Sequence, residues 1–206
     1  MLISIRNSLS LIFIALCVVQ CSTREEVVPA IPVQELREGD VAFRLGRTLE
    51  SDAIAAATQG ESRYSHVGVM VGRGDSLRVV HIEPERAGEE RVKMESVEEF
   101  FHPARAVAGC VARYENLTEW QRQMIEREAL RLHAKGVEFD HDYSLEDTLQ
   151  MYCTELVDYV FRMANVVLTE QRRRVPLVEE EVLFPTDMLK GLQRVWHYDL
   201  RPARHN

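Results

Sequence analysis

Residues 150–161 read Gln150-Met151-Tyr152-Cys153-Thr154-Glu155-Leu156-Val157-Asp158-Tyr159-Val160-Phe161, and the interpretation of the remaining chain depends on them. Apolar side chains recur there at helical spacing and predict an amphipathic helix that begins near Cys153. A thiol in the first turn of a helix lies near the positive end of the helix dipole and near unpaired backbone N–H groups, and both favour the thiolate. The thiolate is the nucleophilic form, and the same N–H groups can hold an oxyanion. Cys153 is therefore a candidate nucleophile, and the alternative is a small hydrophobic residue that packs the helix start.

A nucleophilic thiol needs a base, and a strand-like run upstream offers one. Residues 64–72 are apolar and rich in valine, which predicts a β-strand with His66 near its start. A second strand is predicted over residues 77–82, across a turn at residues 72–75 that is typical of a hairpin, and Glu83 follows it. Adjacent antiparallel strands would bring His66 and Glu83 together at one end of the hairpin.

These three side chains suit nucleophilic catalysis. The imidazole of His66 could take the proton of Cys153, while the carboxylate of Glu83 fixes the tautomer of the ring and stabilises its charged form. A thiolate–imidazolium pair of this kind would keep the thiol ionised near neutral pH.

Five short motifs follow one another along the chain: Glu38-Gly39-Asp40-Val41, Ser65-His66-Val67-Gly68, Ile82-Glu83, Gly136-x-x-Phe139-Asp140 and Tyr152-Cys153-Thr154-Glu155-Leu156-Val157. Together they resemble the circularly permuted branch of the NlpC-type, papain-like cysteine hydrolases, in which His precedes Cys. The resemblance extends over about residues 36–192. It implies an α+β, permuted papain-like fold, with a small antiparallel sheet or barrel packed against helices that include the nucleophile-bearing helix.

The same resemblance implies a role for each site residue. Cys153 would be the nucleophile, His66 the base and Glu83 the orienting third residue. Tyr152 resembles a tyrosine that lines the site in this family and donates a hydrogen bond toward the substrate or the oxyanion, with simple packing as the alternative. The resemblance implies neither a metal nor an organic cofactor.

Further elements are predicted along the chain. A strand follows the turn at residues 38–40, and a short helix covers residues 49–58. Strands are predicted at residues 91–94, 106–114 and 195–200, and short helices at residues 96–101 and 184–189. The strongest helix signal spans Thr118 to Lys135, with Thr118 as N-cap and Gly136 as the end.

The N-terminus is predicted to direct export. An apolar run at residues 9–19 has the length of a signal-peptide core and is too short to span a bilayer. Val18-Val19-Gln20-Cys21 resembles a bacterial lipobox, with Cys21 as the lipidated residue that anchors the protein to a membrane. An ordinary secretory signal and an uncleaved anchor are the alternatives. We thus expect a signal peptide at residues 1–20, a tether at 21–35 and a hydrolase domain at 36–206.

Composition excludes several function classes. The 206-residue chain carries a formal net charge of −8, which disfavours nucleic acid as a partner. Its four cysteines show no CxxC pair and no zinc-ligand spacing. His81 and Glu83 could form a metal pair, but no Pro-Cys-x-x-Cys accompanies them, so a deaminase-type zinc site is excluded. A disulfide between Cys110 and Cys153 would abolish the nucleophile and is the less favoured alternative to two free thiols.

The function expected from these observations is that of an exported, envelope-located cysteine hydrolase. It would cleave amide bonds, for example in cell-wall peptides, through a Cys-His-Glu triad and a thioester acyl-enzyme. One alternative is a lipid or acyl-ester hydrolase or acyltransferase, because the permuted scaffold also resembles the lecithin–retinol acyltransferase group. The other is a catalytically inactive binding lipoprotein, for which Cys153 would be unreactive.

Overall fold

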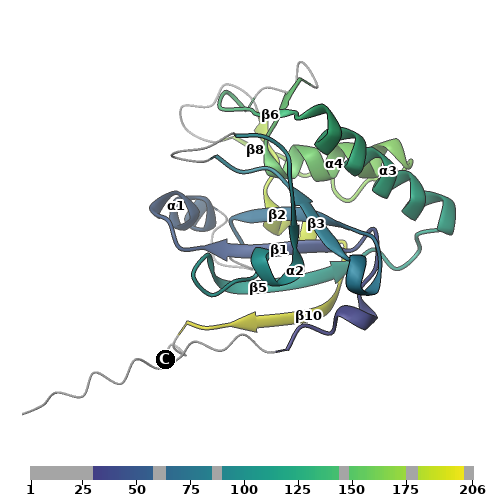
Figure 1. The fold of residues 1–206 in the computed structure, drawn as a ribbon. Coiled ribbons are helices and arrows are strands. Elements are labelled where there is room, and N and C mark those ends of the chain that lie inside the picture. The colour runs from purple at the N-terminus through teal and green to yellow at the C-terminus, as the bar shows by residue number, and fades with distance from the viewer. Residues whose placement is uncertain (1–29, 58–63, 85–89, 144–148, 175–180, 202–206) are drawn as a thin grey trace, which may run out of the picture.

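A six-stranded antiparallel sheet forms the centre of the computed structural model, which describes residues 30–57, 64–84, 90–143, 149–174 and 181–201 (Figure 1). The strand order is β10-β5-β1-β2-β3-β4. The strands are β1 (Val41–Gly46), β2 (His66–Val71), β3 (Arg78–His81), β4 (Lys93–Ser96), β5 (Ala106–Arg113) and β10 (Gln193–Asp199). The sheet is open, with β10 and β4 at its edges, so the sheet alternative of the prediction is confirmed rather than the barrel.

Helices and short ladders surround this sheet. The helices are α1 (Leu49–Ala57), α2 (Val97–Phe100), α3 (Glu119–Lys135), α4 (Cys153–Met163) and α5 (Pro185–Leu189), with 3₁₀ turns η1 (Val33–Glu35) and η2 (Gly74–Ser76). Two small ladders pair β6 (Glu138–Phe139) with β7 (Gln150–Met151) and β8 (Arg173–Arg174) with β9 (Glu181–Val182). All the predicted helices are present, whereas the two small ladders were not predicted because strands of two residues leave no periodic signal.

Alternation along the strands divides the core between the two faces of the sheet. On one face, Val67 and Val69 belong to a first cluster together with Leu156 and Val160 of α4 and Ile125 of α3. Helices α3 and α4 lie side by side over this cluster (Figure 1). The second cluster takes the residues of opposite parity, such as Ala42, Met70 and Val79, with Phe100 and Phe101 from the α2 segment and Trp196 from β10. The sheet is thus buried on both faces, and α2 and α4 approach it from opposite sides.

Capping residues set the ends of the helices that were best predicted. The side chain of Thr118 accepts a hydrogen bond from the N–H of Gln121 at 3.2 Å, and α3 ends at Gly136, whose φ of 63° is left-handed. Ser96 caps α2 in the same way through the N–H of Glu99. Both predicted helix starts are confirmed because capping depends on local sequence.

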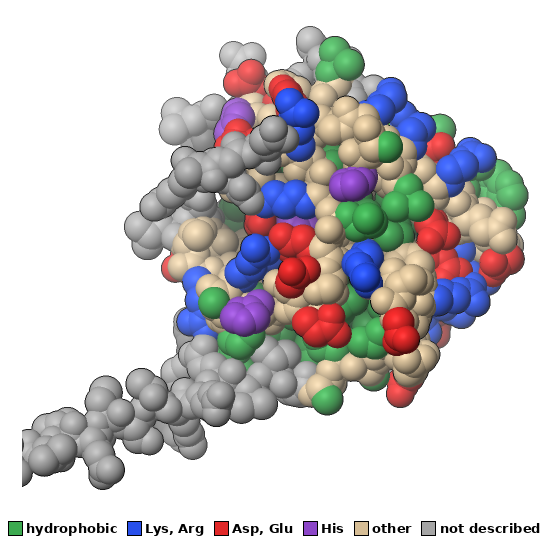
Figure 2. All heavy atoms as spheres, viewed as in Figure 1, with side chains coloured by type: hydrophobic (Ala, Val, Ile, Leu, Met, Phe, Trp, Pro, Cys, Tyr) green, Lys and Arg blue, Asp and Glu red, His purple; other side chains and the backbone are tan. Residues whose placement is uncertain are grey.

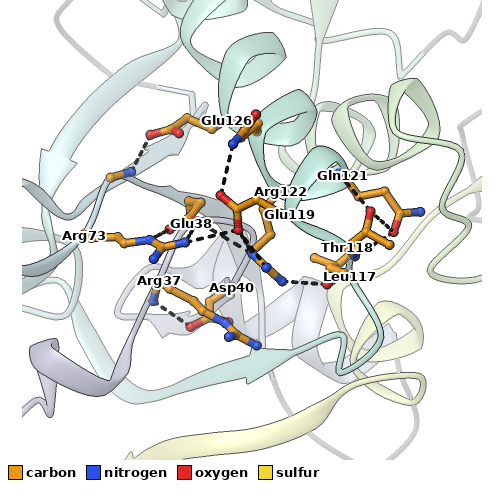
Figure 3. Close-up of polar contacts among 12 residues, drawn as sticks. Arg37, Glu38, Asp40, Arg73, Leu117, Thr118, Glu119, Gln121, Arg122 and Glu126 are labelled. Carbon is orange, nitrogen blue, oxygen red and sulfur yellow. Dashed lines mark hydrogen bonds and ion pairs between the residues drawn. The ribbon is translucent and has the colours of Figure 1, made fainter.

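The Glu38-Gly39-Asp40 motif directly precedes β1 and lies within an ion-pair network that includes Arg122 of α3 (Figure 3). Glu38 is buried and accepts a hydrogen bond from Arg73 Nε at 2.7 Å, and Arg122 of α3 lies 3.7 Å away. Asp40 accepts two hydrogen bonds of 2.7 Å from Arg113 of β5. Buried carboxylates must be paired, and these are. The motif therefore stabilises the fold.

The predicted tether and signal peptide lie mostly outside the described residues, as does Cys21. Within the described part, Ile31 and Val33 pack against the second cluster. No helix among the described residues is long and apolar enough to cross a membrane. Acidic and basic side chains are interspersed over the face shown in Figure 2, so the net negative charge does not gather in one patch there.

Candidate active site

Cys153 is the first residue of α4, where the sequence placed it. The helix start is held by two contacts: Thr154 Oγ1 donates to the carbonyl of Leu183 at 2.7 Å, and the N–H of Tyr152 donates to Glu155 Oε2 at 3.4 Å. Cys153 is partly buried, and both it and the buried Cys110 are free thiols. The disulfide alternative is therefore wrong.

Burial controls the ionisation of the Cys153 thiol. It raises the pKa of Cys153 to about 11, against the opposing effect of hydrogen bonds from the backbone N–H groups of Val67, Thr154 and Cys153 itself. The sequence predicted a thiolate, because the helix dipole and the N–H groups favour the anion. In the structure these groups are present, but the loss of water around the sulfur outweighs them. The resting thiol is protonated at neutral pH.

His66 opens β2, opposite Arg44 of β1, and is buried. Its Nε2 lies 2.9 Å from Nδ1 of His81, and its ring centroid lies 5.8 Å from that of Phe100, with the two planes tilted by 31°. Burial and the positive charge of Arg44 lower the pKa of His66 well below its ordinary value, so the ring is neutral. Val67, the next residue, places its N–H beside the Cys153 sulfur. Among the described residues no hydrogen bond joins the His66 ring to that sulfur.

Glu83 lies next to His66, as the hairpin predicted, but its carboxylate is bound elsewhere. Its Oε2 is 4.0 Å from His66 Nε2, beyond hydrogen-bond distance. The carboxylate instead forms an ion pair with Arg44 and lies 3.4 Å from Lys93 Nζ. Burial would raise the pKa of Glu83, but the positive charge of Arg44, with which it forms an ion pair, helps to lower that pKa far below its usual range, so Glu83 is ionised.

The structure adds His81 to the site. His81 is the last residue of β3, clusters with His66 and Glu83, and is fully buried beside His66 and Phe100. Its Nε2 lies 3.2 Å from Oε2 of Glu95 on β4. The His81-x-Glu83 spacing is the available sequence signal, but by itself it indicates only a metal pair. The contact with Glu95 depends on the β3–β4 register, which the sequence does not show.

Tyr152 is buried, with 2% of its surface exposed. Its ring lies 5.3 Å from that of Tyr143, and burial raises the pKa of its hydroxyl to about 12. The hydroxyl oxygen has no hydrogen-bond partner among the described residues. Packing accounts for this environment, and a role for Tyr152 in holding the oxyanion stays a prediction.

Comparison with known proteins places this site in context. The model of a family described as permuted papain-like amidases, YaeF/YiiX, C92 family, matches residues 35–184. No curated protein matches the chain. A solved structure, described as the metalloprotein yiiX from Escherichia coli O157:H7, is 24% identical, with a TM-score of 0.63 over 78% of this chain and 96% of that chain. That likeness confirms the fold class, a permuted papain-like α+β fold.

His66, His81 and Glu83 are residue types that bind metal ions and lie in one cluster, so their fit to a metal can be tested. One ligand atom from each lies within 4.8 Å of the others. However, Glu83 already pairs with Arg44 and Lys93, and the nitrogens of the two rings share a contact of 2.9 Å. A divalent cation would have to enter beside two fixed positive charges and break that contact. The side chains present do not fit a metal.

Proposed function

Because the chain belongs to the family of permuted papain-like amidases, we propose that it is a cysteine hydrolase that cleaves amide bonds with Cys153 as nucleophile and His66 as base. One observation carries the proposal. The Cys153 thiol, at the start of α4, lies against the N–H of Val67, the residue that follows His66 on β2. The helix start that carries Cys153 and the strand start that carries His66 are thereby neighbours in space although 87 positions apart in the chain, from 153 − 66, while the His66 ring itself lies beside Phe100 of α2.

The proposed reaction begins from a neutral pair. As the sulfur attacks the substrate carbonyl carbon, the thiol proton passes to the free nitrogen of His66, giving a tetrahedral oxyanion and an imidazolium. The N–H groups of Cys153 and Thr154, at the start of the helix, donate to that oxyanion. Collapse breaks the C–N bond, and His66 returns the proton to the leaving amine. The products are a thioester on Cys153 and a free amine.

Water completes the cycle. His66 takes a proton from the attacking water, the C–S bond breaks, and the proton returns to the sulfur, which releases a carboxylic acid and restores the neutral pair. The hydrogen bond between ring and thiol need not exist before substrate binds, because catalytic hydrogen bonds often tighten only in the complex. The reaction has no step through a metal.

Glu83 is proposed to stabilise the imidazolium by charge. Its carboxylate lies 4.0 Å from His66 Nε2 and is ionised. Arg44 and Lys93 hold it in place, and they also neutralise part of its charge. We therefore assign to Glu83 the third position of the triad, acting through its field rather than through a hydrogen bond.

The substrate class is proposed to be an amide, which the family description supports. Export through residues 1–20 and anchoring at Cys21 would place the enzyme in the cell envelope, where peptides of the cell wall are the amide substrates at hand. The acyl-ester and inactive-binding alternatives remain distinct outcomes of the same assay.

The test compares three variants on a panel of peptide amides, including cell-wall peptides, and acyl esters. Cys153→Ser and His66→Ala should each lower kcat/KM by roughly 10³-fold or more, as losing the nucleophile or base does in other hydrolases. His197→Ala is the matched control, because His197 is exposed on β10, at the far edge of the sheet. Full activity of Cys153→Ser would reject the proposal. Turnover of esters alone would favour the acyl alternative, and no turnover of any substrate the inactive one.

A further inference from the structure

A line of polar contacts runs from His66 on β2 to residues of the neighbouring strands. His66 Nε2 lies 2.9 Å from Nδ1 of His81, and His81 Nε2 lies 3.2 Å from Oε2 of Glu95. The other oxygen of Glu95, Oε1, accepts a hydrogen bond of 2.7 Å from Nη1 of Arg105. The line thus connects β2, β3 and β4 and ends at a guanidinium that carries a permanent positive charge.

The contact between His81 and Glu95 is bent, but the two atoms have no other partner. Within the described part of the chain, both His81 Nε2 and Glu95 Oε2 are buried atoms without an aligned hydrogen bond. A buried polar atom left unpaired is costly, so a small rotation that aligns the two is favoured. His81 Nε2 and Glu95 Oε2 are therefore each other's hydrogen-bond partners once aligned.

Protonation along this line follows from the chemistry of each group. Burial would raise the pKa of Glu95, but the contacts with His81 and Arg105 outweigh it and lower the pKa to about 2, so the carboxylate is ionised and can only accept. His81, itself neutral because burial lowers its pKa, must then carry its proton on Nε2. Its Nδ1 is left as an acceptor, and the neighbouring Nε2 of His66 must be the donor.

We propose that Glu95 is a positioning residue of the active site, which acts through His81 to hold the proton of His66 on Nε2 and so leaves Nδ1 of His66 free as the base. The proposal rests on the proposed function, in which His66 receives the thiol proton. It assigns a role to a carboxylate that is two contacts removed from the base and does not touch the substrate.

The surrounding charges agree with this assignment. Besides Glu95, the charged groups that face the two rings are Arg44, Glu83 and Lys93. The ionised Glu83, 4.0 Å from His66 Nε2, also favours a proton on that nitrogen. Arg44 and Lys93 disfavour charging of either ring, which keeps both rings neutral and their tautomers well defined.

Replacing Glu95 by glutamine reverses the pattern. In Glu95→Gln, Arg105 would still donate to an oxygen at the Oε1 position, so the amide NH₂ would face His81. His81 Nε2 would have to accept, its Nδ1 would carry the proton, and His66 Nε2 would become an acceptor. The proton of His66 would then lie on Nδ1, where it blocks transfer from the thiol.

The first measurement reads the tautomers directly and needs no substrate. Two-bond ¹⁵N–¹H spectra of the full chain with labelled histidine, assigned with His66→Ala and His81→Ala, report which ring nitrogen carries hydrogen. In the wild-type protein both His66 and His81 should be protonated on Nε2 at neutral pH. A wild-type His66 with its proton on Nδ1 would overturn the proposal even if the protein were an active hydrolase.

The second measurement compares Glu95→Gln with Glu98→Gln, an exposed glutamate three positions further along the chain. Glu95→Gln should shift the His66 proton to Nδ1 and lower kcat by roughly 100-fold or more with KM nearly unchanged. Losses of this size follow when the carboxylate that orients a catalytic imidazole is removed from other enzymes. Glu98→Gln should change neither. An unchanged kcat in folded Glu95→Gln would refute the positioning role. If Cys153→Ser is also active, the proposed function itself has failed.

Discussion

The protonated resting thiol predicts how Cys153 reacts with an alkylating reagent. With a pKa of about 11, a fraction of about 10⁻⁴ of the thiol is ionised at pH 7, compared with about 3% for an unperturbed cysteine. The ratio is about 300. A thiolate of higher pKa is the stronger nucleophile, with a Brønsted slope of about 0.4–0.5, which restores roughly tenfold. Cys153 should therefore react about 30-fold more slowly than an ordinary thiol at pH 7, before any steric protection.

The assay measures iodoacetamide labelling of each cysteine peptide by mass spectrometry, in the native protein and in the same protein unfolded in urea. The unfolded chain is the matched reference because it holds the same cysteine in water. Cys110, which is fully buried and whose pKa is also raised to about 11 by burial, serves as the protected internal control. For native Cys153, the logarithm of the rate should rise by about one per pH unit through pH 9 without a plateau.

The opposite profile would refute the reasoning. If native Cys153 reacted faster than the unfolded reference at pH 6 and its rate levelled off above that pH, the thiol would already be paired with a charged His66. The neutral resting pair would then be wrong, although Cys153 would still be the nucleophile. Loss of that plateau in His66→Ala would confirm which residue supplies the charge.

Three further predictions concern the same region. Gly68→Ala places a Cβ at 2.6 Å from Val79 Cγ1 and 2.9 Å from His81 Cβ. The substitution should therefore lower the free energy of unfolding, measured by urea titration, by about 1–3 kcal/mol. An unchanged urea midpoint would contradict this close packing. Glu83→Gln should lower kcat less than His66→Ala, because it removes a charge but no proton acceptor, and an unaffected rate would move the third role elsewhere. The free energy of unfolding should fall as pH decreases. All four groups have lowered pKa values in the folded protein, so the unfolded chain binds more protons than the folded one as the pH falls. The stability linked to neutral His66 and His81 is lost below about pH 6.5, the ordinary pKa of histidine. The stability linked to ionised Glu83 and Glu95 is lost below about pH 4.3, the ordinary pKa of glutamate. Equal unfolding midpoints at pH 8 and pH 5 would contradict the histidine part.

The sequence by itself determined the local elements and placed two candidate site residues, Cys153 and His66, at the starts of two of them. The start of α4 at Cys153, the strand that begins at His66 and the caps of α3 and α2 all follow from periodicity and from residues within a few positions of one another. Local hydrogen bonds and side-chain alternation depend on neighbours in the chain, so a single sequence shows them. The five motifs in order were sufficient to predict the fold class, which the family match over residues 35–184 confirms.

Only the tertiary structure decided the electrostatic state of the site. The pKa of Cys153 depends on how much water the surrounding elements remove from the sulfur, and the helix dipole that the sequence showed is the weaker effect. The ion pair of Glu83 with Arg44 and the contact of His81 with Glu95 join strands whose register no local pattern reveals. Charges act through distance and burial, both of which are set when β1 to β4 align. The sequence therefore indicated His66 as the candidate base, while the alignment of the strands determined which charged and polar groups surround its ring.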